Sequence, residues 1–382
     1  SAVSLALGTT FNLNNYSDTI GSLAGAGNVS LGSAALTTGG NNTSTTYSGV
    51  ISGTGSLVKN GSGTFILSGN NTYSGTTTIN GGSLQLGSGG TSGIFGTGNV
   101  SINNSSFLNF NRSGSLSVTN NISGVGYVIK KGSSSLTLSG NNSFTKTTFV
   151  QAGQLIVTSD TGLGSTAGST SISSGASLDL KNVTIGNEYI SIASGATLKT
   201  SSGISSVTGA VSPGIIDIST GAQLTLSGMF DDDNTNTSLV KNGAGTLIIT
   251  NNTNNYGATL INAGTLQVGN GGNTGKLGRL GVTNNAALYI NRSDSPSLSS
   301  IVSSTSGITG TGSVTAHIGG SLNVDRTINL SGANSKIILA SGYNTAAGTE
   351  SGGDVTLTNT ITTSNTGTVT IFSGNTNTST LN

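Results

Sequence analysis

The fold of this chain can be inferred from one segment, Leu57-Val-Lys-Asn-Gly-Ser-Gly-Thr-Phe-Ile-Leu-Ser-Gly-Asn-Asn-Thr-Tyr-Ser-Gly-Thr-Thr-Thr-Ile-Asn-Gly-Gly-Ser-Leu-Gln-Leu-Gly87. A looser copy runs from Val128 to Val157, and a third copy runs from Leu239 to Gly269. The copies are unequally spaced along the chain. Repeats of this kind are typical of solenoids, in which stacked coils bury one continuous core. The repetition therefore predicts a single elongated domain over residues 1–382.

The composition excludes several classes of function. Charged residues make up 7% of the chain, with 13 Lys and Arg against 12 Asp and Glu, so no strong field attracts nucleic acid or an anionic membrane. Cysteine is absent, which excludes disulfides, zinc-thiolate sites and thiol catalysis. No apolar run is long enough to predict a helical membrane span. The beginning of the chain lacks a basic region and is typical of a mature or trimmed end.

Short alternating segments predict β-strands. Residues 83–86, 177–180 and 223–226 alternate polar and apolar side chains, which is the period of a half-buried strand. Gly and Asn accept positive φ, so pairs such as Asn60-Gly61 and Asn242-Gly243 indicate sharp corners. Helix is disfavoured, because Gly, Ser, Thr and Asn interrupt every window long enough to hold one.

The spacing of the corners predicts a parallel β-helix. Gly175, Gly195 and Gly221 mark successive corners, and the intervals between them suit one coil of such a helix. At about 22 residues and ~4.8 Å per coil, the chain makes about 17 coils and a rod on the order of 80 Å long. A hairpin array shares the turn residues, and a β-propeller shares the glycine content. Propeller blades, however, need a strict spacing that the unequal offsets between the repeats do not provide.

A longer duplication supports this interpretation. Residues 98–113 resemble residues 280–293, and each segment contains an arginine, Arg112 or Arg292. The separation of these arginines along the chain nearly equals the separation of Lys59 and Lys241 in the first and third repeats. We interpret the chain as two superunits that came from one ancestor.

The segment that begins Ile51-Ser-Gly-Thr-Gly-Ser-Leu-Val-Lys-Asn-Gly61 and runs to Gly87 resembles the passenger-associated transport repeat of bacterial autotransporters, also called the autotransporter-associated β-strand repeat. The resemblance extends to residues 237–269 and, more weakly, to residues 122–157. It implies a right-handed parallel β-helix passenger secreted across the outer membrane, often an adhesin. The family's C-terminal translocator barrel is expected to be absent from this chain, because the residues after Val355 show no long series of membrane strands. Either the barrel was cleaved or omitted, or the repeat serves in a different secreted assembly.

Candidate catalytic residues are few. Catalysis by paired carboxylates needs two acids at one cleft. Asp179 and Asp217 are candidates for such a pair on successive coils, although a solvated face is the favoured interpretation of both. A carbohydrate-active enzyme would require a clustered acid site that the sequence does not show. We therefore predict a protein that is not an enzyme and that binds no cofactor, apart from calcium as described next.

One anionic cluster is a candidate metal site. Asp231, Asp232 and Asp233 concentrate carboxylate oxygens, which are the ligands that Ca²⁺ takes. The cluster lacks the glycine and the distal glutamate of an EF-hand loop, so a solvated loop is the favoured interpretation.

His317 is the single histidine, which excludes a multi-histidine metal site, and we expect it at the surface or at a corner. The repeated lysines beside a turn are expected to cap corners or to discourage sideways strand pairing; they are Lys59, Lys130 and Lys241. Asn70-Asn71 and Asn141-Asn142 are expected to form stacked asparagine ladders that satisfy corner amides. One aromatic residue per repeat is expected to stack in the core and not to bind sugar; these residues are Tyr73, Phe144 and Tyr256.

These observations predict a non-enzymatic extracellular protein of the bacterial surface, associated with the outer membrane or released from it. Its mechanism would be adhesion or aggregation through many weak polar contacts along one flank. The expected partners are glycans or proteins of host or bacterial surfaces, or further copies of the chain, and not nucleic acid. The alternative is a structural subunit that stacks through the ends of its β-helix into a fibre or layer, because such ends present unpaired strand edges.

Overall fold

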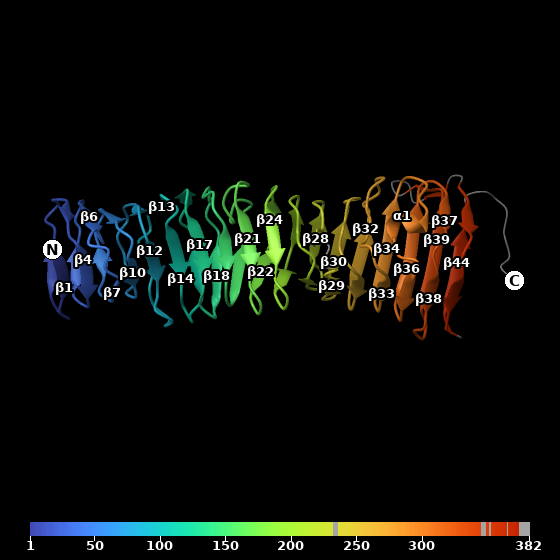
Figure 1. Cartoon of the computed structure of the whole chain (residues 1–382), viewed down its shortest axis with the longest axis horizontal. Coiled ribbons are helices and arrows are strands. Elements are labelled where there is room, and N and C mark those ends of the chain that lie inside the picture. Colours follow the sequence, from blue (N-terminus) through green and yellow to red (C-terminus); the bar gives the residue numbers. More distant parts are fainter. Residues whose placement is uncertain (232–235, 345–348, 351–352, 365, 374–382) are drawn as a thin grey trace. The chain divides into compact units, whose positions relative to one another are not determined.

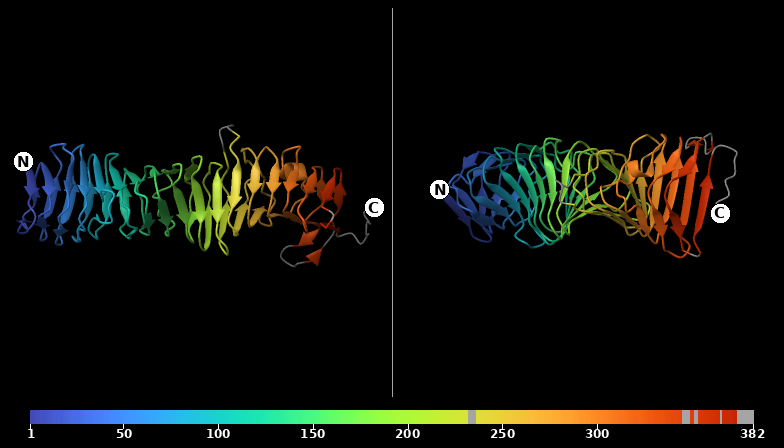
Figure 2. Two further views of the ribbon diagram at one scale, coloured as in Figure 1. Left: turned by 90° about the horizontal axis from the view of Figure 1, so that it is seen from below. Right: turned by 45° about the vertical axis from the view of Figure 1, so that its right-hand side comes forward.

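The structure is a computed structural model that describes residues 1–231, 236–344, 349–350, 353–364 and 366–373. It divides into two compact units, residues 1–196 and residues 197–382. Figure 1 shows the strands of each unit side by side, and Figure 2 shows the same coils from two further directions. The single elongated domain expected from the repeats stays a prediction.

The first unit has three walls of strands, that is, parallel sheets in which each coil contributes one strand. Its longest wall contains β1 (Ala2–Leu5), β4 (Ser22–Gly25), β7 (Thr45–Tyr47), β10 (Thr64–Leu67), β12 (Ser83–Leu86), β14 (Phe107–Phe110), β17 (Tyr127–Lys130), β19 (Thr148–Val150), β21 (Ser169–Ile172) and β24 (Tyr189–Ile192). A second wall contains β3 (Asp18–Thr19), β6 (Ala35–Thr38), β9 (Ser56–Lys59), β11 (Thr77–Ile79), β13 (Val100–Ile102) and β16 (Ile122–Gly124). The third wall is made of two separate sheets. One contains β2 (Thr10–Asn12), β5 (Asn28–Ser30) and β8 (Ile51–Ser52), and the other, farther along the chain, contains β15 (Leu116–Val118), β18 (Ser135–Leu138), β20 (Gln154–Val157) and β22 (Ser177–Leu180). The short strand β23 (Thr184–Ile185) also belongs to this unit.

The second unit has two long walls and some shorter pairings. One wall contains β25 (Thr197–Thr200), β27 (Ile215–Ile218), β29 (Leu239–Asn242), β31 (Thr259–Ile261), β33 (Val282–Asn284), β35 (Ile308–Gly310), β38 (Ile328–Leu330) and β43 (Ile361–Thr363). The other contains β26 (Ile204–Val207), β28 (Gln223–Leu226), β30 (Thr246–Ile249), β32 (Thr265–Val268), β34 (Ala287–Arg292), β36 (Ser313–Ile318), β39 (Lys336–Ser341) and β44 (Thr368–Phe372). The shorter pairs are β37 (Leu322–Val324) with β42 (Val355–Leu357), and β40 (Tyr343–Asn344) with β41 (Thr349–Glu350). One helical turn, α1 (Leu298–Ile301), interrupts the strands.

The strands pair in parallel, with neighbouring coils in register. In the first unit, for example, Phe65 of β10 lies opposite Leu84 of β12, which lies opposite Leu108 of β14. The short hairpin of β40 and β41 is antiparallel. The structure therefore confirms the predicted all-β fold, a parallel β-helix solenoid.

The alternation of the sequence explains the core. In β18, Leu136 and Leu138 point inward and are buried, whereas Ser135 and Thr137 are partly exposed. The chain then turns at residues that accept left-handed backbone, such as Gly61 and Gly243, both with φ of 72°. Each coil thus contributes a few apolar side chains to a core that neighbouring coils continue.

Asparagines at the corners stack, but at positions other than those expected. The Asn80 side chain donates to the Asn60 side chain at 3.0 Å, and Asn103 donates to Asn80 at 3.0 Å. Asn262 donates to Asn242 at 2.9 Å in the same part of the third repeat. These ladders start at the Asn-Gly corners, Asn60-Gly61 and Asn242-Gly243.

Asn71 and its counterparts satisfy corner amides without stacking on one another, which corrects the predicted ladder. Asn71 Oδ1 accepts from the backbone N of Ile51 at 2.8 Å, and its Nδ2 donates to the carbonyl of Ile94 at 2.6 Å. Asn142 and Asn254 make the equivalent pair of contacts to the coils on either side. The side-chain amide of asparagine has one acceptor oxygen and two donor hydrogens. One buried Asn can therefore bond backbone groups of both neighbouring coils, which a contact between two asparagines would not achieve.

The repeated aromatic side chains lie in the core, as predicted, and each is fully buried: Tyr73, Phe144 and Tyr256. The tyrosine hydroxyls form hydrogen bonds to a threonine in the same repeat, at 2.7 Å between Tyr73 and Thr77 and at 3.0 Å between Tyr256 and Thr259. The second repeat has Phe144 instead, and the buried Oγ1 of its threonine, Thr148, has no partner among the described residues.

We expect Phe144→Tyr to stabilise the protein, because the new hydroxyl supplies the partner that Thr148 lacks. The gain should be about 0.5–1.5 kcal/mol, which is typical of one intramolecular hydrogen bond. Tyr73→Phe should lower the free energy of unfolding by a similar amount, since it leaves Thr77 without this bond. Urea unfolding of both variants checks this. A Phe144→Tyr protein less stable than wild type would show that the core does not admit the hydroxyl.

Candidate functional site

The most unusual polar groups of the structure are the repeated lysines, which point into the coil and not into solvent. Lys59 and Lys241 are fully buried, and Lys130 is nearly so. Lys59 Nζ donates to the carbonyls of Asn60, Gly61 and Gly81, at 2.8, 3.0 and 3.1 Å. Two of these carbonyls belong to its own corner, and the third belongs to the equivalent corner of the next coil, after β11.

The other two copies repeat this arrangement. Lys241 Nζ donates to the carbonyls of Asn242 and Gly243, both at 2.7 Å, and to Ala263 at 3.1 Å. Lys130 Nζ donates to Gly132 and, at 3.1 Å, to Ala152. An ammonium group has three donor hydrogens and no acceptor, so it can satisfy carbonyls from two successive corners at once. The predicted role of these lysines as corner caps is therefore confirmed, although the cap lies inside the coil.

The lysines do not form a row that one ligand contacts. Within the first unit, Lys59 ends β9 in the second wall, whereas Lys130 ends β17 in the longest wall. Equivalent repeats thus occupy different walls of the coil, because the length of chain between them is not a whole number of coils. This geometry disfavours a shared ligand site.

Burial changes the titration of these lysines. Removal from water penalises the ammonium form, which lowers the pKa of Lys59, Lys130 and Lys241 to about 8. The Asp217 carboxylate acts in the opposite direction on the pKa of Lys241.

Each of the two acids considered for catalysis lies beside a lysine. Asp179 lies opposite Ile156 in the sheet, and its Oδ2 is 3.8 Å from Lys181 Nζ. Asp217 lies opposite Lys199 and Asn242 on its two neighbouring strands, and its Oδ2 is 4.0 Å from Lys199 Nζ. Their surroundings are those of structural ion pairs. Asp179 is buried, however, which corrects its expected place on a solvated face.

A buried glutamate, Glu188, was not predicted from the sequence as a site residue. Glu188 lines an open pocket of about 410 Å³ together with Asp160, Thr161 and Thr166. Its Oε1 accepts from Thr170 Oγ1 at 2.5 Å, and burial raises the pKa of Glu188 to about 7. The Asp160 Oδ1 accepts from the backbone N of Thr184 at 2.7 Å. No local pattern signals this site, because Glu188 precedes its strand in a segment with no repeat partner.

The candidate calcium cluster is only partly visible. Asp232 and Asp233 lie outside the described residues. Asp231 forms an isolated parallel β-bridge with Asn255. Calcium binding there stays a prediction. Among the residues that are described, no group of three acidic or histidine side chains is arranged to hold a metal ion.

His317 lies in β36 at a partly exposed position, so it is at the surface, as expected, although not at a corner. Its Nδ1 and the Tyr289 hydroxyl share a hydrogen bond of 2.9 Å, and the two rings meet edge to face. Partial burial lowers the pKa of His317.

The two superunits share a second device, an arginine that holds a surface loop. Arg112 donates to the carbonyls of Thr91 and, at 2.8 Å, Gly93. Arg292 makes the same contacts to Asn273 and Gly275, at 2.8 and 2.9 Å, and also pairs with Asp294 at 2.5 Å. The structure thus shows two loops clamped alike, as expected from the duplication.

Comparisons with known proteins point in one direction. The model of the passenger-associated-transport-repeat matches residues 57–86, 128–157 and 239–268. The chain is similar to the protein called adhesin BmaC autotransporter from Brucella suis biovar 1 (strain 1330), with 28% identity over 402 aligned positions. The aligned region covers 79% of this chain and 12% of that relative. No solved structure matches the chain. Among the described residues, no helix is both long and apolar enough to cross a membrane.

We expect Lys59→Met to destabilise the protein, because the carbonyls of Asn60, Gly61 and Gly81 lose their donor. Leaving such groups unsatisfied costs about 1–3 kcal/mol. Lys146→Met, which changes an exposed lysine, should stay within about 0.5 kcal/mol of wild type. Chemical unfolding measures both variants. Equal stability of the two would contradict a structural role for the buried ammonium group.

The same lysines predict a pH dependence of stability. Their folded pKa of about 8 lies below the ordinary value of 10.5, so between these values the unfolded chain binds more protons than the folded chain. The free energy of unfolding contributed by the lysines therefore rises as pH increases above about 8. The test measures the free energy of unfolding of wild type and of Lys59→Met at several pH values from about 7 to about 9.5. This range lies below the pH at which tyrosine in the unfolded chain ionises fully. Wild type should gain stability relative to the variant as pH rises, and a parallel pH profile would refute the assignment.

Proposed function

Because this chain is an autotransporter passenger that carries three passenger-associated transport repeats, we propose that it acts as a non-enzymatic adhesin on the bacterial surface. The relative from Brucella is named an adhesin, and the shared repeats support the same role here. The extracellular location, at the outer membrane or after release from it, follows from passenger secretion and belongs to this proposal.

The observation that carries the proposal is a row of uncharged polar side chains on the second unit. Gln223, Thr246 and Thr265 lie opposite one another on β28, β30 and β32, and each is half-buried on the outer face. Successive coils repeat such groups at the strand spacing of ~4.8 Å. A partner with regularly spaced hydroxyls or amides can bind several coils at once, and many weak contacts then add up to useful avidity.

Two of the described acidic side chains are engaged in ion pairs. Asp217 pairs with Lys199, and Asp294 pairs with Arg292, so both carboxylates serve structure. Glycans and proteins of host or bacterial surfaces are the partner classes that uncharged hydrogen-bonding groups suit, and further copies of the chain present the same groups. Nucleic acid is disfavoured by the near-zero net charge of +1.

Binding of the labelled, purified chain to epithelial cells, bacterial cells and immobilised glycans tests the proposal. We expect saturable binding that the double variant Thr246→Val and Thr265→Val reduces by about tenfold or more, because multivalent contacts lose affinity together. Thr148→Val is the matched control, since it removes a buried hydroxyl and leaves the outer face unchanged.

Two results would contradict the proposal: no binding above that of an inert protein on any of these surfaces, or equal binding by the double variant and the control. Sedimentation across a concentration series separates binding to a foreign partner from self-association. Larger species that grow with concentration would make copies of the chain the partner.

A further inference from the structure

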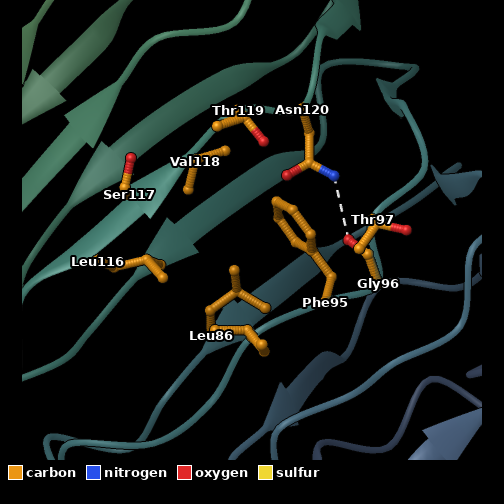
Figure 3. Close-up of a pocket in the computed structure, with 10 residues that line it drawn as sticks. Leu86, Phe95, Gly96, Thr97, Leu116, Ser117, Val118, Thr119 and Asn120 are labelled. Atoms are coloured by element: carbon orange, nitrogen blue, oxygen red, sulfur yellow. Dashed lines mark hydrogen bonds between the residues drawn. The ribbon is translucent and has the colours of Figure 1, made fainter.

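An apolar pocket in the first unit lies where the second unit has an extra segment of chain. The pocket has a volume of about 160 Å³ and lies between residues 94–97 and the next coil. Figure 3 shows Leu86 and Phe95 from one coil and Leu116 and Val118 of β15 from the next, with the Asn120 amide bonded to Gly96 at one end. A cavity of about this size has room for a group as large as benzene.

Equivalent hydrogen bonds show that the corresponding place in the second unit is residues 276–279. Asn71 Nδ2 donates to Ile94, and Asn254 Nδ2 donates to Lys276, both at 2.6 Å. In the same way, the side-chain oxygens of Asn70 and Asn252 accept from the backbone N of the glycine that precedes each of these segments. In both units the arginine that holds the loop, Arg112 or Arg292, comes later in the sequence than this segment. Phe95 therefore corresponds to Leu277.

The second unit covers this place with its own chain. The segment that leads from Arg292 to β35 is longer than the segment that leads from Arg112 to β16 in the first unit. The additional residues include α1, whose Leu298 and Ile301 are buried. The backbone N of Leu277 donates to the carbonyl of Ile301 at 2.9 Å.

In the part of the chain that the structure describes, the first unit has no equivalent of α1 over this place, and one backbone N–H there has no acceptor. Phe95 is 5% exposed, yet its backbone N–H has no acceptor among the described residues. A nearly buried N–H without a partner costs free energy that a bound acceptor would recover. β15 is also an edge strand, paired with β18 on one side only.

We propose that this pocket binds an aliphatic peptide segment of a partner protein, in the way that the second unit holds Leu298–Ile301. One Leu- or Ile-sized side chain fills the cavity between Phe95, Leu116 and Val118, and a backbone carbonyl of the segment accepts from Phe95 N–H. The partner is thus a protein with an exposed aliphatic stretch, not a glycan. This inference does not rest on the adhesin proposal, because it uses a different surface in the other unit.

A peptide copied from the chain itself is the first probe. It spans Pro296–Ser303, is capped at both ends and carries a fluorophore. Anisotropy should show saturable binding to the full chain, and the same peptide with Leu298→Ser and Ile301→Ser should bind about tenfold more weakly or worse, because the apolar side chains drive the contact.

Two variants place the binding in the pocket. Leu116→Asp puts a charge among its lining residues, and Ser117→Asp puts one at an exposed lining position that does not disturb the core. Both should lose most of the affinity. Leu280→Asp, at an exposed leucine of the second unit, is the matched control and should bind like wild type. Peptide binding that all three variants retain would overturn the proposal.

Amide hydrogen exchange provides an independent measurement. The unpartnered amide of Phe95 should exchange at least about tenfold faster than that of Leu277 in the free protein, and the peptide should slow Phe95 toward the rate of Leu277. An exchange rate of Phe95 that saturating peptide leaves unchanged would refute the proposed hydrogen bond. Absence of any saturable peptide binding would refute the site itself.

Discussion

Backbone polar groups at the corners of the coils impose the main physical demand on this molecule. Along the strands, neighbouring coils satisfy one another's N–H and C=O groups. At the corners the chain leaves the ladder, and a buried group without a partner costs about 1–3 kcal/mol. With 7% of its residues charged, the chain has few charged side chains available to bond these groups, and several of them lie at the corners.

Lys, Asn and Arg each solve a part of this problem. The buried lysines contact carbonyls of two successive corners, Asn71 and its counterparts link neighbouring coils, and Arg112 and Arg292 hold the loops that follow a repeat. In a coil so poor in charge, these residues serve internal cohesion. Polar side chains such as Ser, Thr and Gln are then left to form the outer faces.

Duplication explains where the two units differ. Both superunits have equivalent corner contacts, and loss of any one would leave several backbone groups unsatisfied. The second unit has a longer segment than the first at the place where α1 covers its coil. The open pocket of the first unit is the physical trace of this difference.

Local sequence pattern was enough to predict the class of fold and the core. Alternating segments such as residues 135–138, corners such as Gly61, and the buried aromatic of each repeat all follow from it, because strand period and positive φ are properties of short stretches. The three-dimensional arrangement was needed to learn which wall each repeat occupies, that Lys59 points inward, that Glu188 is buried and that Phe95 faces an open pocket. These features depend on which residues of one coil lie above those of the next, and that register is the sum of every loop length between them, which no short stretch of sequence contains.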